Sequence, residues 1–369
     1  MTNAVSVAQY GSSNPTMRNR IINGSMIIDQ RNAGASVTPT NGQYTLDRWV
    51  FSVSQASKLT TQQSSTVPAN FINSMLVTSS SAYSVGSGDY FNVQTKIEGF
   101  NCSDLGWGTS NAKTVTLSFQ VYSSLTGTFG GAIQNNAGNR SYPFSYTISS
   151  ANTWTTVSVT IPGDTTGTWL TNNSVGMVVY FSLGTGTTYS GAAGTWAGSD
   201  YRSATGASSV VGTNGATWYF TGVQLEAGST ATPFEYRQYG TELALCQRYA
   251  WVIKGIGAGN QMVAGPNFPR LGTYQYLAYG SGTSTPVPMR IAPSLTASGN
   301  FQWITYGSTP GDGYTTGLVA SGGVNLTAAS NTYVAYRIGN TGNSNFGSAM
   351  VIFLLDYDGT AVLINSAEL

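Results

Sequence analysis

A loop rich in Gly, Ser and Thr spans residues 184–215 and contains Tyr189, Trp196, Tyr201 and Arg202. An aromatic ring can stack on the apolar face of a sugar while nearby Asn, Ser and Asp side chains bind its hydroxyl groups. Loops of this length are uncommon in compact β domains and often bind a ligand. These four side chains therefore predict a site for a neutral glycan. The alternative is that they form the loop's own small core or pack against a neighbouring subunit.

The remaining tryptophans divide between strand-like segments and turns. Trp49, Trp154 and Trp218 occur in alternating apolar and polar segments, which predicts a place in the core. Trp107 and Trp169 lie at turns. Trp169 is accordingly a fifth candidate for glycan contact.

The chain has few residues of the types that catalyse reactions. There is no His, which excludes Ser-His-Asp and Cys-His nucleophiles, histidine bases and His-ligated zinc. The 14 Asp and Glu residues could include a glycosidase pair. However, Asp29, Asp47, Glu98 and Asp104 each lie near Arg or Lys or in a turn, as structural ion pairs and caps do. We therefore expect no catalytic residue and no enzyme activity.

Motifs for metals, phosphates and redox chemistry are also weak. Cys102 and Cys246 belong to no Cys-x-x-Cys pattern and are expected to be reduced core thiols, although a bridge stays open if they meet in space. The segment 356–359 lacks the further oxygen ligands of a calcium loop and predicts a hairpin turn. The glycine-rich segments 127–131 and 184–186 lack a following Gly-Lys-Ser/Thr. We expect no metal and no cofactor.

The composition of the 369 residues limits the partners further. The 15 Lys and Arg residues are scattered and balance the 14 Asp and Glu residues, so we expect no nucleic-acid partner. The longest apolar run is far shorter than the about 20 residues that cross a bilayer, and no secretory signal is evident. We therefore expect that the protein does not insert into a membrane and that it is synthesised in the cytoplasm. With 41% hydrophobic and 12% aromatic residues the chain should fold.

Period-two alternation predicts strands rather than helices over most of the chain. The clearest segments are 49–53, 114–122, 153–161, 175–183 and 216–225, followed by 274–278, 301–306, 332–338, 351–357 and 360–364. The last two flank Asp358-Gly359, the strongest hairpin signal in the sequence. Spacing typical of a helix occurs only near residues 241–250, with Thr241 as a candidate N-cap.

These elements predict an all-β protein. We expect an N-terminal anchoring arm at residues 1–16, an antiparallel jelly-roll or β-sandwich domain at 17–240, a connector helix at 241–250, and a smaller β-sandwich domain at 251–369. No short repeat typical of a parallel β-helix or a propeller is present.

Several segments resemble bacteriophage and prophage tail-fibre-like structural proteins. They are 17–32 (MRNRIINGSMIIDQRN), 44–49 (YTLDRW), 96–109 (KIEGFNCSDLGWGT), 115–128 (VTLSFQVYSSLTGT), 161–169 (IPGDTTGTW), 223–249 (VQLEAGSTATPFEYRQYGTELALCQRY) and 286–300 (PVPMRIAPSLTASGN). The residues that recur in this pattern are expected to build the fold. They are Asn23, Gly24, Asp29, Gln30, Arg31, Asp47, Arg48 and Trp49.

The resemblance implies a jelly roll similar to carbohydrate-binding modules in a virion protein, without catalytic residues. It implies a tail fibre or tip that attaches the particle to host-surface polysaccharide, a homotrimer, and contact with other virion proteins through the arm. Two alternatives stay open. A capsid decoration or head-fibre protein is the first. A capsule depolymerase is the weaker one, because β-helix repeats and a recognisable acid pair are missing.

Overall fold

The structure, a computed structural model, describes residues 17–254, 260–265, 277–279, 283–284, 286–298, 300–306, 315–320, 324–329, 333–339, 351–356 and 362–369. The expected arm at 1–16 lies outside the described residues. Contacts divide the chain into two compact units, Met1–Glu242 with Leu369, and Leu243–Glu368. In the described part of the chain, no helix is long and apolar enough to cross a membrane.

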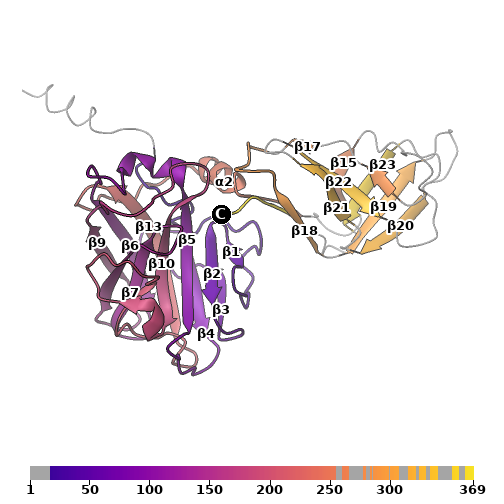
Figure 1. Cartoon of the computed structure of the whole chain (residues 1–369). Coiled ribbons are helices and arrows are strands. Elements are labelled where there is room, and N and C mark those ends of the chain that lie inside the picture. Colours follow the sequence, from indigo (N-terminus) through magenta and orange to yellow (C-terminus); the bar gives the residue numbers. More distant parts are fainter. Residues whose placement is uncertain are drawn as a thin grey trace, which may run out of the picture. The chain divides into compact units, whose positions relative to one another are not determined.

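Two antiparallel sheets lie face to face in the first unit (Figure 1). The six-stranded sheet has the order β1 (Tyr44–Leu46), β2 (Trp49–Val53), β5 (Tyr90–Glu98), β10 (Val175–Thr185), β7 (Gly127–Gln134) and β8 (Ser141–Ile148). The five-stranded sheet has the order β3 (Leu59–Ser64), β4 (Ser74–Ser79), β13 (Thr217–Ala227), β6 (Val115–Ser123) and β9 (Thr155–Ile161). The predicted all-β sandwich is confirmed.

Alternating side chains from both sheets fill the space between them. The ring of Phe181 on β10 lies 5.1 Å from the rings of Phe119 on β6 and Phe220 on β13. Trp49 on β2 meets Phe220 edge to face, with ring centroids 4.9 Å apart. All four side chains are at most 1% exposed. Because β2 and β10 belong to one sheet and β6 and β13 to the other, these rings join the two layers.

One tryptophan lies outside the core in which it was expected. Trp49 and Trp218 are fully buried, as the sequence predicted, whereas Trp154 is half-buried. Trp154 immediately precedes β9, and its ring packs against Tyr122 and Tyr219. Tyr122 is half-buried between the buried residues Val121 and Ser123, so its ring belongs to the outer side of the sheet. The alternating pattern was read correctly as a strand, but Trp154 lies on its solvent side.

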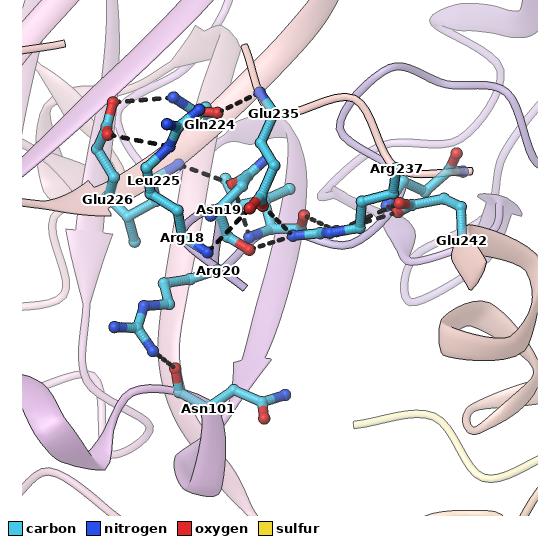
Figure 2. Close-up of polar contacts among 12 residues, drawn as sticks. Arg18, Asn19, Arg20, Asn101, Gln224, Leu225, Glu226, Glu235, Arg237 and Glu242 are labelled. Atoms are coloured by element: carbon cyan, nitrogen blue, oxygen red, sulfur yellow. Dashed lines mark hydrogen bonds and ion pairs between the residues drawn. The ribbon is translucent and has the colours of Figure 1, made fainter. Parts of the chain in front are cut away.

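The resemblance segment at 17–24 is bound to β13 and to the segment before the helix, as Figure 2 shows. Both carboxylate oxygens of Glu235 accept backbone hydrogen bonds, from Arg18 at 3.2 Å and from Asn19 at 2.9 Å. Arg237 donates to the backbone carbonyls of Asn19 and Ile21. Arg237 also forms ion pairs with Glu235 at 3.1 Å and with Glu242 at 3.3 Å. These charged residues therefore fasten the beginning of the unit to its end.

Asn23 and Asp47 show why the recurring polar residues fit a structural role. The amide nitrogen of Asn23 donates to the carbonyls of Ile28 and Asp47 at 2.8 and 2.9 Å, and the Asn23 side chain is fully buried. The buried Asp47 carboxylate accepts from the backbone and side chain of Gln30 at 2.7 and 2.6 Å. Its ion pair with Arg31 is 3.5 Å long. Side chains that satisfy buried backbone groups in this way hold a loop in one conformation.

The helix α2 spans Tyr239–Gln247, which is shifted toward the N-terminus relative to the expected 241–250. Both cysteines are buried and unbridged: Cys102 in the first unit and Cys246 at the end of the helix in the second. This agrees with the reading as core thiols.

The second unit is built from antiparallel strands in the part that the structure describes. One sheet has the order β14 (Ala250–Lys254), β24 (Val362–Ser366) and β18 (Ser294–Ser298). A second sheet has the order β15 (Asn260–Gly265), β23 (Val351–Asp356), β19 (Asn300–Tyr306) and β20 (Thr315–Ala320). A third has the order β16 (Leu277–Tyr279), β22 (Tyr333–Gly339) and β17 (Thr283–Ser284), and β21 (Val324–Ala329) also pairs with β22. Residues 274–276 of the expected strand 274–278 lie outside the described residues.

The hairpin predicted around Asp358-Gly359 is wrong. β23 pairs with β15 on one edge and β19 on the other, while β24 pairs with β14 and β18. Both backbone edges of each strand are therefore occupied by other strands, so the two cannot pair with each other. Residues 357–361, which hold the Asp-Gly pair, lie outside the described residues. Local turn chemistry was outweighed here by long-range pairing.

Candidate functional site

Residues 184–215 are more structured than the long loop that the sequence predicted. β10 extends to Thr185, a 3-10 turn covers Thr187–Tyr189, and β11 (Ser190–Gly191) pairs in parallel with β12 (Ser203–Ala204). β12 packs along β7 and β8 of the six-stranded sheet. This segment, called the 184–215 loop below, therefore has a fixed conformation against that sheet.

The loop carries Arg202 to the outer face of the six-stranded sheet, beside two tyrosine rings. The guanidinium carbon of Arg202 lies 4.4 Å from the ring centroid of Tyr90 and 4.6 Å from that of Tyr189. The two rings meet edge to face at 5.2 Å. Tyr90, Tyr189, Asp200 and Arg202 are called the Arg202 cluster. All four side chains are partly exposed, so they can reach a ligand.

Asp200 fixes the plane of the guanidinium. Arg202 Nη2 and Nε contact the two Asp200 oxygens at 2.7 and 3.0 Å, a bidentate pair. Gln134 donates to Asp200 at 2.7 Å and accepts from the hydroxyl of Tyr180 at 3.1 Å. The chain of hydrogen bonds continues from the loop into β7 and β10. Arg202 is thus held rigidly rather than being a free surface cation.

The charges of this pair are stabilised at neutral pH. Burial opposes ionisation of Asp200, but hydrogen bonds from Arg202 and Gln134 outweigh it and hold the pKa of Asp200 below its usual value. Burial also opposes the charge on Arg202, yet its pKa is raised because Asp200 accepts two of its hydrogen bonds. Burial raises the pKa of Tyr180 to about 12, so its hydroxyl keeps its proton.

Two amide side chains on β5 were missed by the sequence reading. Asn92 and Gln94 alternate with core residues and lie on the outer face of the sheet, 0% and 8% exposed. Thr185 donates to Asn92 Oδ1 at 3.1 Å, but Asn92 Nδ2 and Gln94 Oε1 have no hydrogen-bond partner in the protein. Both atoms are closed off from the surface, so they are exceptions to the rule that buried polar atoms have a partner. The signal was the alternation of polar residues in YFNVQTKIE.

Trp169 and Trp196 come together in a separate place, with Trp107. The three rings meet edge to face, with centroids 4.7 to 5.8 Å apart. Trp169 is 9% exposed, and its Nε1 donates to Asp164 at 3.2 Å. Trp196 is partly buried, packs also against Tyr142 at 5.2 Å, and donates from Nε1 to the carbonyl of Pro162 at 3.0 Å. This tryptophan cluster anchors the loop to the core.

Tyr201 lies between the two groups in sequence but joins neither through its ring. It is partly exposed, and its ring covers the backbone of Gly191 on β11 so closely that a Cβ there would lie 2.2 Å from it. The structure therefore brings Tyr189 together with Arg202, and Trp169 together with Trp196. The glycan-binding role of all five residues stays a prediction.

Two further carboxylates hold arginines. Arg140 binds Asp164 through Nε at 2.8 Å and Nη2 at 2.6 Å, and Arg20 meets Asp104 at 2.7 Å. Among the described residues, no three His, Cys, Asp or Glu side chains gather into a group that could hold a metal ion. The outer face around the Arg202 cluster offers a ligand aromatic rings and one oriented guanidinium.

No family model and no curated protein matches this chain. One similar solved structure is the enzymatically active domain of tailspike protein 4 of bacteriophage CBA120, at 13% identity and TM-score 0.31. The match covers 57% of this chain and only 22% of the tailspike chain. A putative sugar binding protein from Bacteroides thetaiotaomicron matches over 57% of this chain and 100% of its own, at 14% identity and TM-score 0.33. The family 11 carbohydrate-binding module of Clostridium thermocellum cellulase Lic26A-Cel5E matches over 54% and 99%, at 13% identity and TM-score 0.27.

Proposed function

We propose that the protein is a structural component of a phage virion, a tail fibre or tip that binds a host-surface glycan without cleaving it. The observation that carries the binding part is the Arg202 cluster, in which two partly exposed tyrosine rings flank an oriented guanidinium. Rings beside a fixed hydrogen-bond donor are suited to a sugar, which offers both an apolar face and oxygen atoms.

Each part of the cluster has a distinct role in this proposal. The partly exposed rings of Tyr90 and Tyr189 stack on the sugar, and Arg202 donates hydrogen bonds to its oxygens. Asp200 acts as a positioning residue, because it holds the guanidinium through two hydrogen bonds. A rigid site loses little side-chain entropy on binding.

The virion part of the proposal is supported by the segments that resemble phage tail-fibre-like proteins. Residues 18–20 and 224–242 of those segments form the network of Figure 2. They account for the fold rather than for a reaction. In this proposal the arm at 1–16 contacts other virion proteins, the chain assembles as a trimer, and the protein is made in the host cytoplasm.

Adsorption of virions to host cells tests the glycan site. Particles carrying Tyr90→Ala or Tyr189→Ala should adsorb about tenfold more slowly, the effect of losing one stacked ring. Ile72→Ala is the matched control, because Ile72 is 76% exposed and lies outside the Arg202 cluster. Unchanged adsorption of both tyrosine variants would count against the site.

Two further measurements separate the alternatives. Imaging of particles that carry a tagged copy should place few copies at the tail; many copies on the head would favour a decoration protein. Incubation of the purified protein with host polysaccharide should release no new reducing ends. New reducing ends would instead favour a capsule depolymerase.

A further inference from the structure

A row of large side chains crosses the outer face of the five-stranded sheet, opposite the core. Tyr219 on β13 is directly opposite Tyr122 on β6 and Leu76 on β4. The rings of Tyr122 and Tyr219 meet edge to face at 5.1 Å, and Trp154 lies 5.5 Å from Tyr122. All four side chains are half-buried rather than covered. The row Leu76, Tyr219, Tyr122 and Trp154 is called the outer aromatic row.

The strands of this face carry almost no charge. The five strands contain a single charged residue, Glu226 at the end of β13. Glu226 is 2% exposed and accepts hydrogen bonds from Gln224 and Thr232 at 2.9 and 2.7 Å. Soluble proteins usually place charged residues on a solvent-facing sheet surface, partly to prevent association. A surface of this kind is suited to a neutral partner.

A groove lies next to the row on the same face, with a volume of about 360 Å³. The sheet contributes hydroxyl and amide side chains to it, and the segments 69–71 and 231–236 contribute aromatic rings. Its floor includes Ser118, Gln120, Thr156 and Ser158, and its wall includes Phe71, Phe234 and Tyr236. The three wall rings are 5.0 to 5.5 Å apart, and Tyr236 is 58% exposed.

The groove and the row are adjacent along the strands. Gln120 precedes Tyr122 by two residues on β6, and Thr156 lies directly opposite Gln120 on β9. Residues two apart on a strand point to the same face. Aromatic rings therefore border a polar floor of hydroxyls and amides on both sides.

We propose that this groove and the outer aromatic row form a second ligand site, for an uncharged polysaccharide, on the sheet opposite to the Arg202 cluster. Stacked rings accept the apolar faces of successive sugars, and the floor binds their hydroxyl groups. The near absence of charge on the strands favours a neutral partner over an acidic or basic one, and the polar floor distinguishes the surface from an apolar protein interface. The inference is independent of the site proposed above.

Electrophoresis of the purified full chain through native gels that contain a soluble polysaccharide tests the proposal. The neutral probes are a mixed-linkage β-glucan, a galactomannan, dextran and a mannan, with alginate as the charged probe. At least one neutral probe should retard the protein, and Tyr122→Ala, Tyr219→Thr and Trp154→Ala should each weaken that binding about tenfold. Trp154 lies outside any strand, so this variant leaves the strand propensities unchanged.

Phe100→Ala is the matched control, because Phe100 is 59% exposed and belongs to neither proposed site, and it should keep this binding. Retardation that Tyr189→Ala abolishes and the variants of the outer aromatic row leave unchanged would come from the Arg202 cluster and would overturn this proposal. Unfolding midpoints of the variants show that each is folded. Three results overturn the proposal: no retardation by any neutral probe, equal retardation of the variants and the parent chain, or stronger retardation by alginate. A lower molecular mass of the variants in sedimentation also overturns it, because the face would then join copies of the chain.

Discussion

The side-chain oxygen of Asn19 accepts a 3.0 Å hydrogen bond from the backbone N–H of Leu225, 206 residues away in the sequence. The amide nitrogen of Asn19 donates to the carbonyl of Val223 at 3.0 Å, and the side chain is 1% exposed. The same oxygen accepts from the N–H of Ile21 at 3.0 Å. Asn19 thus satisfies backbone groups of β13 beside the bulge that begins after Thr221.

Asn19→Ala should lower the free energy of unfolding by about 3 kcal/mol, because it leaves two N–H groups and one carbonyl buried without partners. Denaturant unfolding followed by tryptophan fluorescence measures the change. Asn136→Ala is the control, since Asn136 is exposed in a turn, and it should change stability by less than about 0.5 kcal/mol. Equal stability of both variants would show that the network of Figure 2 is not needed for folding.

The ion pair between Asp164 and Arg140 should make the folded protein less stable in acid. Burial opposes its ionisation, but hydrogen bonds from Arg140 and Thr166 outweigh it and hold the pKa of Asp164 below its usual value. Between the lowered pKa of the folded state and the unfolded pKa of about 3.9, the folded protein binds fewer protons than the unfolded chain. Its free energy of unfolding therefore falls as the pH falls. Above about pH 5 the contribution is complete.

Asp164→Asn should therefore cost about 3 kcal/mol at pH 7, where Arg140 loses its partner, and should flatten the decline below pH 5. Unfolding midpoints measured from pH 7 to 3 test both effects. Asp104→Asn removes an ion pair whose carboxylate side is 48% exposed, and should cost less than about 1 kcal/mol. A decline as steep in Asp164→Asn as in the parent chain would contradict the assignment.

Five strands of the first unit with regular alternation could be predicted from the sequence, whereas β5, which also alternates, was missed. β2 matches its prediction, and β6, β9, β10 and β13 begin and end within two residues of theirs. β7 was missed because of its glycines. A Cβ at Gly131 would lie 2.3 Å from the carbonyl oxygen of Tyr180 and 2.4 Å from the ring of Phe144. Only glycine fits there, so close packing in three dimensions explains a residue that locally disfavours a strand.

The candidate site was predictable in its loop residues and not in their partners. Tyr189 and Arg202 were found from composition alone, but Tyr90 is on β5, far away in the sequence. Only the pairing of β5 with β10 brings these elements together. The separate tryptophan cluster arises in the same way, since Trp107, Trp169 and Trp196 come from three different connections. Long-range pairing is also what overturned the hairpin at Asp358.

Gly24 should tolerate no side chain. A Cβ at this position would lie 2.1 Å from the carbonyl oxygen of Val223, a backbone atom that is held by the neighbouring strands. Gly24→Ala should lower the free energy of unfolding by more than about 2 kcal/mol. Gly88→Ala is the matched control, because no atom lies within 4 Å of a Cβ there. The midpoints of denaturant unfolding of the two variants test this prediction. Equal midpoints would contradict the close approach of Gly24 to the Val223 carbonyl.

Cys102 should resist thiol reagents while the first unit is folded. Its side chain is 8% exposed, and burial raises the pKa of the thiol to about 12, so almost none is present as the reactive thiolate at pH 8. Labelling with a chromogenic disulfide at pH 8 should be slow for the native protein and rapid in denaturant. Because Cys102 and Cys246 are both free, the denatured chain should release two equivalents without a reductant.

Ser87→Cys gives the positive control for that experiment, since residue 87 is exposed in a turn and a thiol there should react at once. Fast labelling of native Cys102, at a rate like that of the Ser87→Cys thiol, would mean that the turn over residues 99–105 opens readily. Release of no thiol from the denatured chain until reductant is added would mean that the cysteines are bridged. Slow native labelling supports the packed arrangement, in which the Cys102 thiol donates to the carbonyls of Glu98 and Gly99 at 3.7 and 3.6 Å.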